Sequence, residues 1–230
     1  MKTKLFSFCV CFVLASGAAF AQSAQIKAGV NLANVSVTDN GSVEDARQLT
    51  SFHVGIIGDL PLGNGAFAFQ PGILFSGKGS ETKTGSTSSS YYNRQTFNPK
   101  YIEIPANFIF KLAASKEYKF FAGAGPYLGI GVGGKNKAAG RFAGIDYSGE
   151  QKIQFSNDDP TTVDEEEGTG FGLMRRFDYG FNGTAGIEGK TAVLSLNYGY
   201  GLAKLQSGAK SSANDYNKHR LIGLSIGFKF

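Results

Sequence analysis

The closing stretch Leu221-Ile-Gly-Leu-Ser-Ile-Gly-Phe-Lys-Phe230 alternates between two kinds of side chain. One set is large and apolar (Ile222, Leu224, Ile226, Phe228, Phe230), and the intervening set is mostly small or polar (Leu221, Gly223, Ser225, Gly227, Lys229). A period of two is typical of a half-buried β-strand. The second set is too small to fill the core of a soluble sandwich. The pattern therefore favours a strand with one face against lipid and the other lining a narrow lumen.

Seven further segments alternate in the same way, which predicts eight strands in all. Glycine supports this prediction, because its 32 positions are about twice the ordinary share and disfavour helices. We expect Pro105, which cannot donate to a ladder, to produce a bulge or kink. The expected strands are residues 24–37, 51–60, 66–78, 97–111, 117–133, 174–187, 191–202 and 221–230.

The connections alternate between long and short. Long polar segments are expected at 38–50, 79–96, 134–173 and 206–216, and short turns at 61–65, 112–116 and 188–190. Within 134–173 we expect two weak strand-like pieces, 141–147 and 152–155. Long extracellular loops and short periplasmic turns are typical of outer-membrane barrels. We therefore predict an all-β, eight-stranded antiparallel up-and-down transmembrane β-barrel. A soluble calyx of the lipocalin type is the alternative, but it would point its large residues inward.

The first residues have the features of an export signal. Lys2 and Lys4 precede an apolar run that ends at Ala19-Phe-Ala21, which predicts a cleavable signal peptide at 1–21 and a barrel domain at 22–230. Cys9 and Cys11 would leave with it, so a disulfide or a cysteine metal site is not expected. The net charge would fall from +5 to +3, as 21 basic and 18 acidic residues remain. This charge is too small to indicate a nucleic-acid partner.

Several motifs also occur in a characteristic order: Lys27-Ala-Gly-Val-Asn-Leu32, the Phe-x-Phe-x-Pro-Gly-Ile-Leu-Phe-Ser-Gly-Lys-Gly core within 62–79, Tyr101-Ile-Glu-Ile-Pro105, Phe121-Ala-Gly-Ala-Gly-Pro-Tyr127, Phe177-Asp-Tyr-Gly180 and the end 224–230. Together they resemble the PorT-like, or porin family, outer-membrane β-barrel domain proteins of Bacteroidota-type bacteria. The resemblance covers nearly all of the expected mature chain. It implies an eight-stranded barrel in the cell outer membrane, and it supplies no catalytic residues.

The inward positions of the predicted strands carry charges of both signs. In a barrel of eight strands the interior is only wide enough for side chains, and buried charges persist when they are paired. We therefore expect these residues to pair and to block the lumen. The alternative is a selectivity ring in a narrow passive porin-type channel. The set comprises Lys27, Asp59, Glu103, Lys111, Arg176, Asp178 and Lys229.

Two histidines, His53 and His219, are predicted near the extracellular rim, with Ser51 and Asp215 close in sequence. Such a group could serve a rim hydrolase or acyltransferase. However, the sequence lacks a nucleophile motif such as G-x-S-x-G. We expect the two histidines to be hydrogen-bonded to neighbouring groups, and we expect no enzyme activity.

The remaining charges are expected at the cell surface. The acidic run 158–167 does not match an EF-hand loop and is interpreted as a solvated loop, so no metal or cofactor is expected. Lys210, Lys218 and Arg220 would lie where lipopolysaccharide phosphates are found. The expected partners are outer-membrane lipids, lipopolysaccharide, the barrel-assembly machinery during insertion and an unidentified extracellular ligand. We expect a monomer with a structural or surface-interaction role.

Overall fold

The computed structural model describes residues 23–36, 38–39, 42–43, 47–63, 65–86, 89–155, 173–203 and 218–230. The expected signal peptide, the acidic residues 158–167, Lys210 and Asp215 lie outside these ranges. Within the described part of the chain, no helix is long and apolar enough to cross a membrane.

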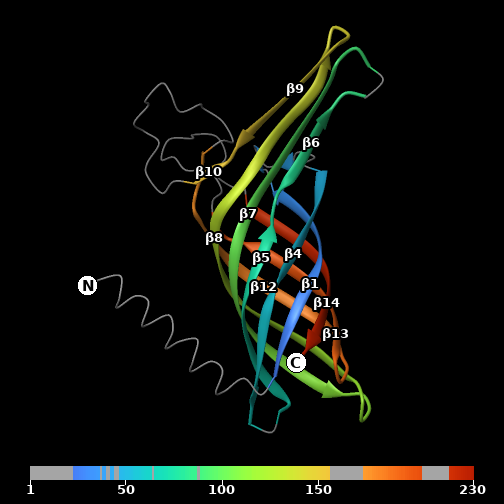
Figure 1. Ribbon diagram of the computed structural model, residues 1–230, viewed down its shortest axis with the longest axis vertical. Coiled ribbons are helices and arrows are strands. Elements are labelled where there is room, and N and C mark those ends of the chain that lie inside the picture. The colour runs from blue at the N-terminus through green and yellow to red at the C-terminus, as the bar shows by residue number, and fades with distance from the viewer. Residues whose placement is uncertain are drawn as a thin grey trace, which may run out of the picture.

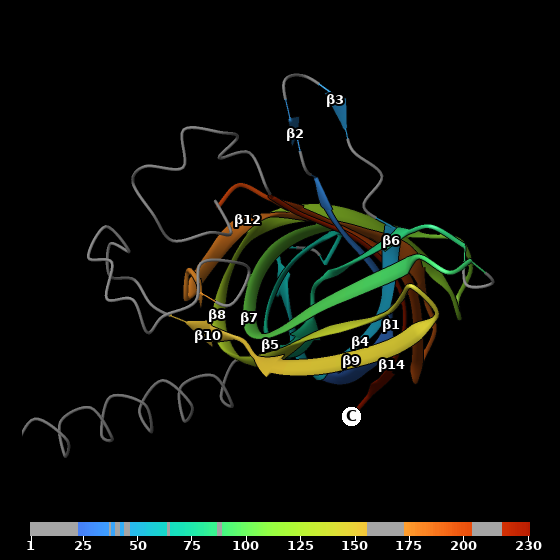
Figure 2. The ribbon, with the colours of Figure 1, turned by 90° about the horizontal axis from the view of Figure 1, so that it is seen from above.

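Eight of the described strands close into a ring. Each pairs antiparallel with the next along the chain, and the last pairs with the first. Figure 2 looks along the long axis and shows the strands surrounding a common interior. The predicted all-β, antiparallel up-and-down arrangement is thus confirmed. The strands are β1 (Ser23–Ser36), β4 (Arg47–Leu62), β5 (Phe67–Gly77), β7 (Tyr92–Ala113), β8 (Lys119–Phe142), β12 (Phe177–Glu188), β13 (Ala192–Gly201) and β14 (Lys218–Lys229).

The contact between β1 and β14 closes the ring and shows how the two faces are used. Ile26 lies opposite Phe228, and their side chains are 51% and 57% exposed on the outer face. Asn31 and Ser225, at inward positions of the same two strands, are 0% and 2% exposed. On these two strands the large residues therefore point outward and the small or polar ones inward, which is the reverse of a soluble calyx.

The described residues of two long segments expected between strands form β-hairpins. Strand β6 (Ser80–Thr84) pairs with the start of β7, and the end of β8 pairs with β9 (Ile145–Lys152). The loop expected over 79–96 was therefore wrong where these strands lie, whereas the strand-like pieces expected at 141–147 and 152–155 overlap observed strands. Every residue of β9 is exposed. A strand with both faces in solvent has no apolar alternation, so its sequence resembles a loop.

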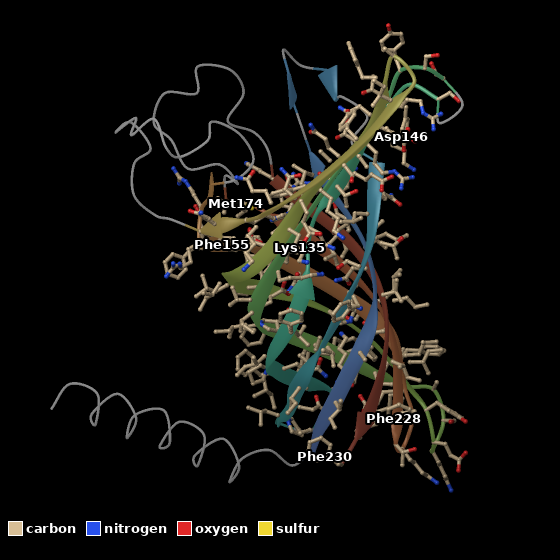
Figure 3. All side chains as sticks on the ribbon, turned by 45° about the horizontal axis from the view of Figure 1, so that its top comes forward. Lys135, Asp146, Phe155, Met174, Phe228 and Phe230 are labelled. Atoms are coloured by element: carbon tan, nitrogen blue, oxygen red, sulfur yellow. The ribbon has the colours of Figure 1, made fainter. Side chains whose placement is uncertain are left out.

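These hairpins extend well beyond the ring at one end, called here the upper end (Figure 1). Strands β6 and β9, with the parts of β7 and β8 that pair with them, form the surface sheet. Phe230 lies at the opposite, lower end, where the short turns are found, whereas Asp146 lies near the upper tip (Figure 3). Part of the expected polar segment 38–50 is also strand: β2 (Thr38–Asp39) pairs with β3 (Ser42–Val43), and β4 begins at Arg47.

Pro105 does not shift the register of its strand. The pairs Ile104 with Leu128 and Phe108 with Ala124 belong to one continuous register. The irregularity lies instead at Lys100 and Tyr101, where Val132 is the extra residue on β8. A missing donor therefore weakens the ladder locally at Pro105 without displacing the strands.

Candidate functional site

A cluster of charged side chains crosses the lower part of the lumen. Lys111 Nζ lies 2.5 Å from Asp59 Oδ2 and 2.7 Å from Glu188 Oε2. Lys229 Nζ lies 2.5 Å from Glu188 Oε1, and Gln70 donates to Asp59 at 3.1 Å. The side chains of Lys111, Asp59 and Glu188 are each less than one tenth exposed. This lower cluster joins residues from β4, β5, β7, β12 and β14, so it braces opposite sides of the ring.

A second cluster crosses the lumen nearer the upper end. Lys78 Nζ contacts Glu103 Oε2 at 2.7 Å and Asp178 Oδ2 at 2.9 Å, and all three side chains are buried. Tyr127 donates its hydroxyl to Asp178 Oδ2, and Asn182 donates to Glu103. The Lys78 ammonium also lies 3.9 Å from the centroid of the Tyr127 ring. This upper cluster is centred on a lysine that was absent from the predicted set.

Arg176, which was predicted to belong to the lumen network, lies elsewhere. It is exposed and donates to the backbone oxygen of Phe155 at 3.2 Å. The reason is that β12 begins at Phe177, so the alternation of that strand does not extend to Arg176. Lys78 provides the cation beside Glu103 and Asp178 instead.

Between the two clusters, a chain of hydrogen bonds starts at Lys27. Its ammonium donates to Asn197 at 2.7 Å, and Asn197 donates to Ser225 at 2.7 Å. His53 places Nε2 2.7 Å from Ser225 Oγ and Nδ1 2.6 Å from Asn31 Oδ1. The Asn31 amide oxygen can only accept, so His53 donates a hydrogen bond from Nδ1. Its Nε2 then accepts a hydrogen bond from the Ser225 hydroxyl.

The two histidines do not form a shared rim site. His53 is buried within the lumen, whereas His219 packs edge-on against Tyr101, with ring centroids 5.5 Å apart. Ser51 accepts from Lys100 at 3.3 Å, and Asp215 lies outside the described residues. Ser225, His53 and Asn31 do have the connectivity of a nucleophile, base and orienting group. However, the adjacent cavity of about 50 Å³ has room for a few water molecules and not for an acyl chain.

Opposite charges balance among these lumen groups. Four lysines (Lys27, Lys78, Lys111, Lys229) face four carboxylates (Asp59, Glu103, Asp178, Glu188). The lower cluster is neutral by itself, whereas the upper cluster has one more carboxylate than lysine. Lys27 supplies the compensating charge from the hydrogen-bond chain below. The interior therefore stays neutral overall, which limits the cost of burying eight ionised groups.

A cluster of apolar side chains lies at the upper end of the lumen. Ile153 and Met174 pack with Val35 of β1 and Phe97 of β7, and Phe155 packs against this group. Strands β10 (Gln154–Phe155) and β11 (Leu173–Met174) pair in parallel and hold Phe155 and Met174 side by side (Figure 3). Phe155 also contacts Tyr101 edge-on, with ring centroids 5.7 Å apart. This apolar cap lies directly above the buried residues of the lumen.

The surface sheet exposes both aromatic and charged side chains. At its tip, Tyr91 and Phe142 pack edge-on at 5.4 Å while both remain exposed, as does Ile145. Below them, Arg141 forms a two-point contact with Asp146. Those hydrogen bonds hold the pKa of the Asp146 carboxyl below its usual range. The sheet thus combines an apolar tip with a stalk held by exposed ion pairs.

The comparisons with known proteins identify the family. A family model described as an outer membrane protein beta-barrel domain matches residues 20–207. The chain belongs to this outer-membrane β-barrel family. The expected outer-membrane location is thereby confirmed, and the apolar outer face is the surface that contacts lipid. Among curated proteins, none matches the chain.

Several solved structures of outer-membrane proteins are also similar to this family member. Ail, the attachment invasion locus protein of Yersinia pestis, solved with the heparin analogue sucrose octasulfate, is 14% identical with a TM-score of 0.39, over 90% of this chain and 98% of that chain. Neisserial surface protein A is 13% identical with a TM-score of 0.43, over 90% and 97%. OprG from Pseudomonas aeruginosa is 9% identical with a TM-score of 0.39, over 91% and 96%.

Two of the three cations expected to contact lipopolysaccharide lie in the described part of this barrel domain. Arg220 donates to the backbone oxygens of Gly201 and His219, both at 2.9 Å, and stacks 3.7 Å from the centroid of the Tyr200 ring. Lys218, at the start of β14, is half-buried. Arg220 is therefore already engaged in holding β13 and β14 together. Among the described residues, no cluster of His, Cys, Asp and Glu could hold a metal ion.

Proposed function

We propose that the protein is a closed eight-stranded transmembrane barrel whose surface sheet binds partners outside the cell, and that it does not conduct solutes. The observation that carries this proposal is the contrast between the two parts of the molecule. The lumen is crossed by two clusters of paired charges beneath an apolar cap. The surface sheet, by contrast, exposes all eight residues of β9 and an aromatic tip. A closed interior would make the barrel rigid, and the exposed surface sheet would be the part that contacts a partner.

The proposed orientation places the surface sheet outside the cell and the short turns in the periplasm. It rests on the asymmetry of the connections, as in other outer-membrane barrels. The barrel-assembly machinery would insert the chain after removal of residues 1–21. Lipopolysaccharide phosphates would then meet Lys210 and Lys218, with Arg220 contributing its charge from its place between β13 and β14. The narrower PorT-like affiliation rests on the sequence motifs alone.

The orientation can be tested with single cysteines, since the expected mature chain has none. Ser148→Cys places a thiol on the exposed β9, and Ser115→Cys places one in a short exposed turn at the lower end. On intact cells, a membrane-impermeant maleimide should label Ser148→Cys and leave Ser115→Cys unlabelled until the outer membrane is opened. The reverse pattern would show that the barrel is inserted upside down.

The binding role predicts that attachment depends on the surface sheet and not on the barrel. In one variant, Asn-Gly replaces residues 136–151 and joins the facing ends of β8 and β9 by a tight turn. In a second, Phe142, Ile145 and Tyr147 become serine, which removes apolar contact area and keeps the hairpin. Both should lower the attachment of displaying cells by about tenfold, because a few aromatic anchors carry most binding energy.

Attachment can be measured on immobilised extracellular-matrix proteins and on heparin, with cells that display equal amounts of each variant. Ser148→Ala with Gln151→Ala serves as a matched control on the same exposed strand and should attach like the parent. If cells with and without residues 136–151 attach equally to every coating, the binding role is wrong, even if the lumen is closed.

A further inference from the structure

A hollow of about 410 Å³ lies on the outer face at the lower end of the barrel. It is bounded on one side by Glu117 and Tyr118, just before β8. On the other side lies the turn formed by Gly189, Lys190 and Thr191, which joins β12 to β13. The volume falls within the roughly 300–1,000 Å³ range of small-molecule sites. Two short turns therefore form the walls of a site that opens toward the membrane.

The floor of this hollow is apolar and continuous with the lipid-facing surface. Ile187, Leu194 and Ile226 occupy adjacent cross-strand positions on β12, β13 and β14. Their side chains are 41–52% exposed on the outer face. The Tyr118 ring forms part of the wall, since a side chain at Gly189 would meet it at 3.6 Å. An alkyl chain that lies on this floor would continue directly into the membrane interior.

One ion pair stands at the open edge of the hollow. Lys190 Nζ lies 3.0 Å from Glu117 Oε1, and the two side chains are 71% and 60% exposed. An exposed pair of this kind contributes little to stability. Its two partners belong to different turns, so a ligand with both charges can exchange with it without disturbing the ring. The edge thus offers one cation and one anion, each on a flexible exposed side chain.

We propose that this hollow binds one phospholipid whose headgroup carries a phosphodiester and a primary ammonium group. An acyl chain lies on Ile187, Leu194 and Ile226, Lys190 donates to the phosphate, and Glu117 accepts from the ammonium. This assignment rests on the proposed orientation, which places the hollow at the inner leaflet of the outer membrane. The charges of the site and of the headgroup are then complementary in pairs.

The carboxylate of Glu117 provides the basis for selectivity. A primary ammonium has three N–H donors, as a lysine side chain does, and can form a charge-assisted hydrogen bond with Glu117. A choline headgroup has the same charge but no N–H donor. A glycerol headgroup has no cation, so its lipid would leave Glu117 next to a phosphate. We therefore expect the ethanolamine lipid to be preferred over both.

The test measures lipids retained by the purified, folded barrel in native mass spectrometry. Phosphatidylethanolamine, phosphatidylcholine and phosphatidylglycerol with identical acyl chains are offered in equal amounts. The barrel should retain one lipid molecule. The form bound to phosphatidylethanolamine should be about three- to tenfold more abundant than the form bound to either other lipid, as two charge-assisted contacts would allow. Glu117→Gln should remove the preference over phosphatidylcholine, and Lys190→Gln should weaken retention of both of these lipids.

The control is Lys119→Gln, which removes the same charge from an exposed residue near the hollow that does not line it. It should retain lipids like the parent. Equal retention of the three lipids, or a preference that survives both Glu117→Gln and Lys190→Gln, would mean that only nonspecific boundary lipid is bound. None of these outcomes depends on whether the surface sheet binds partners.

Discussion

Replacing Lys78 with methionine should destabilise the folded barrel by about 3 to 5 kcal/mol, because the change leaves two buried carboxylates without their shared cation. Glu103 and Asp178 contact Lys78 at 2.7 and 2.9 Å, and each is less than one tenth exposed. No other described lysine forms an ion pair with either carboxylate. Methionine is similar to lysine in length and is apolar. The loss of stability will therefore come from the missing charge and not from a cavity.

The measurement is the temperature at which the compact, faster-migrating form disappears on a detergent gel, checked by circular dichroism because the chain lacks tryptophan. Lys83→Met is the matched control. It removes an ion pair with Glu81 in the surface sheet, where both side chains are more exposed, and should cost about 0 to 1 kcal/mol. Equal stability of Lys78→Met and Lys83→Met would show that the upper cluster does not brace the barrel.

A triple variant separates lost pairing from lost packing. Lys78→Met combined with Glu103→Gln and Asp178→Asn removes all three charges and keeps the side-chain volumes. It should recover part of the stability, because replacing a whole buried ion pair is often neutral. The recovery is partial because Lys27 loses the negative charge that it compensates. Glu103→Ala alone should cost less than Lys78→Met, since Lys78 keeps Asp178 as its partner. The cation left beside the alanine is then Lys78, and not Arg176 as the alternation first indicated.

The ring itself was predictable because lipid on one side and a narrow lumen on the other impose alternation along every strand. Asp59 and Lys111 were assigned inward from parity alone, and both are buried. The parity of Ala68, Gln70 and Ser76 also extends to Lys78, and that of Asn182 and Thr184 extends to Glu188. Lys78 is the last residue of the expected strand 66–78, and Glu188 was assigned to the expected turn 188–190.

The surface sheet was predictable only in part, as the weak strand-like pieces 141–147 and 152–155. Beyond the ring neither face of β9 is buried, so apolar alternation is weak there. Pairing partners also depend on register, which sequence patterns do not specify across a ring. For this reason Lys111 could be placed in the lumen, whereas its contacts with Asp59 and Glu188 could not be assigned.

The proposed closure of the lumen is tested most directly by planar-bilayer recordings of the purified barrel. The lower cluster spans five strands, the upper cluster lies above it, and the apolar cap lies at the upper end. An ion would have to separate several buried charge pairs to pass, at a cost of several kcal/mol for each. The parent protein, verified as folded by its gel mobility, should therefore show no steady conductance across the voltage range in which the bilayer is stable. A large, steady and ion-selective conductance would contradict the closed lumen and favour a narrow porin-type channel.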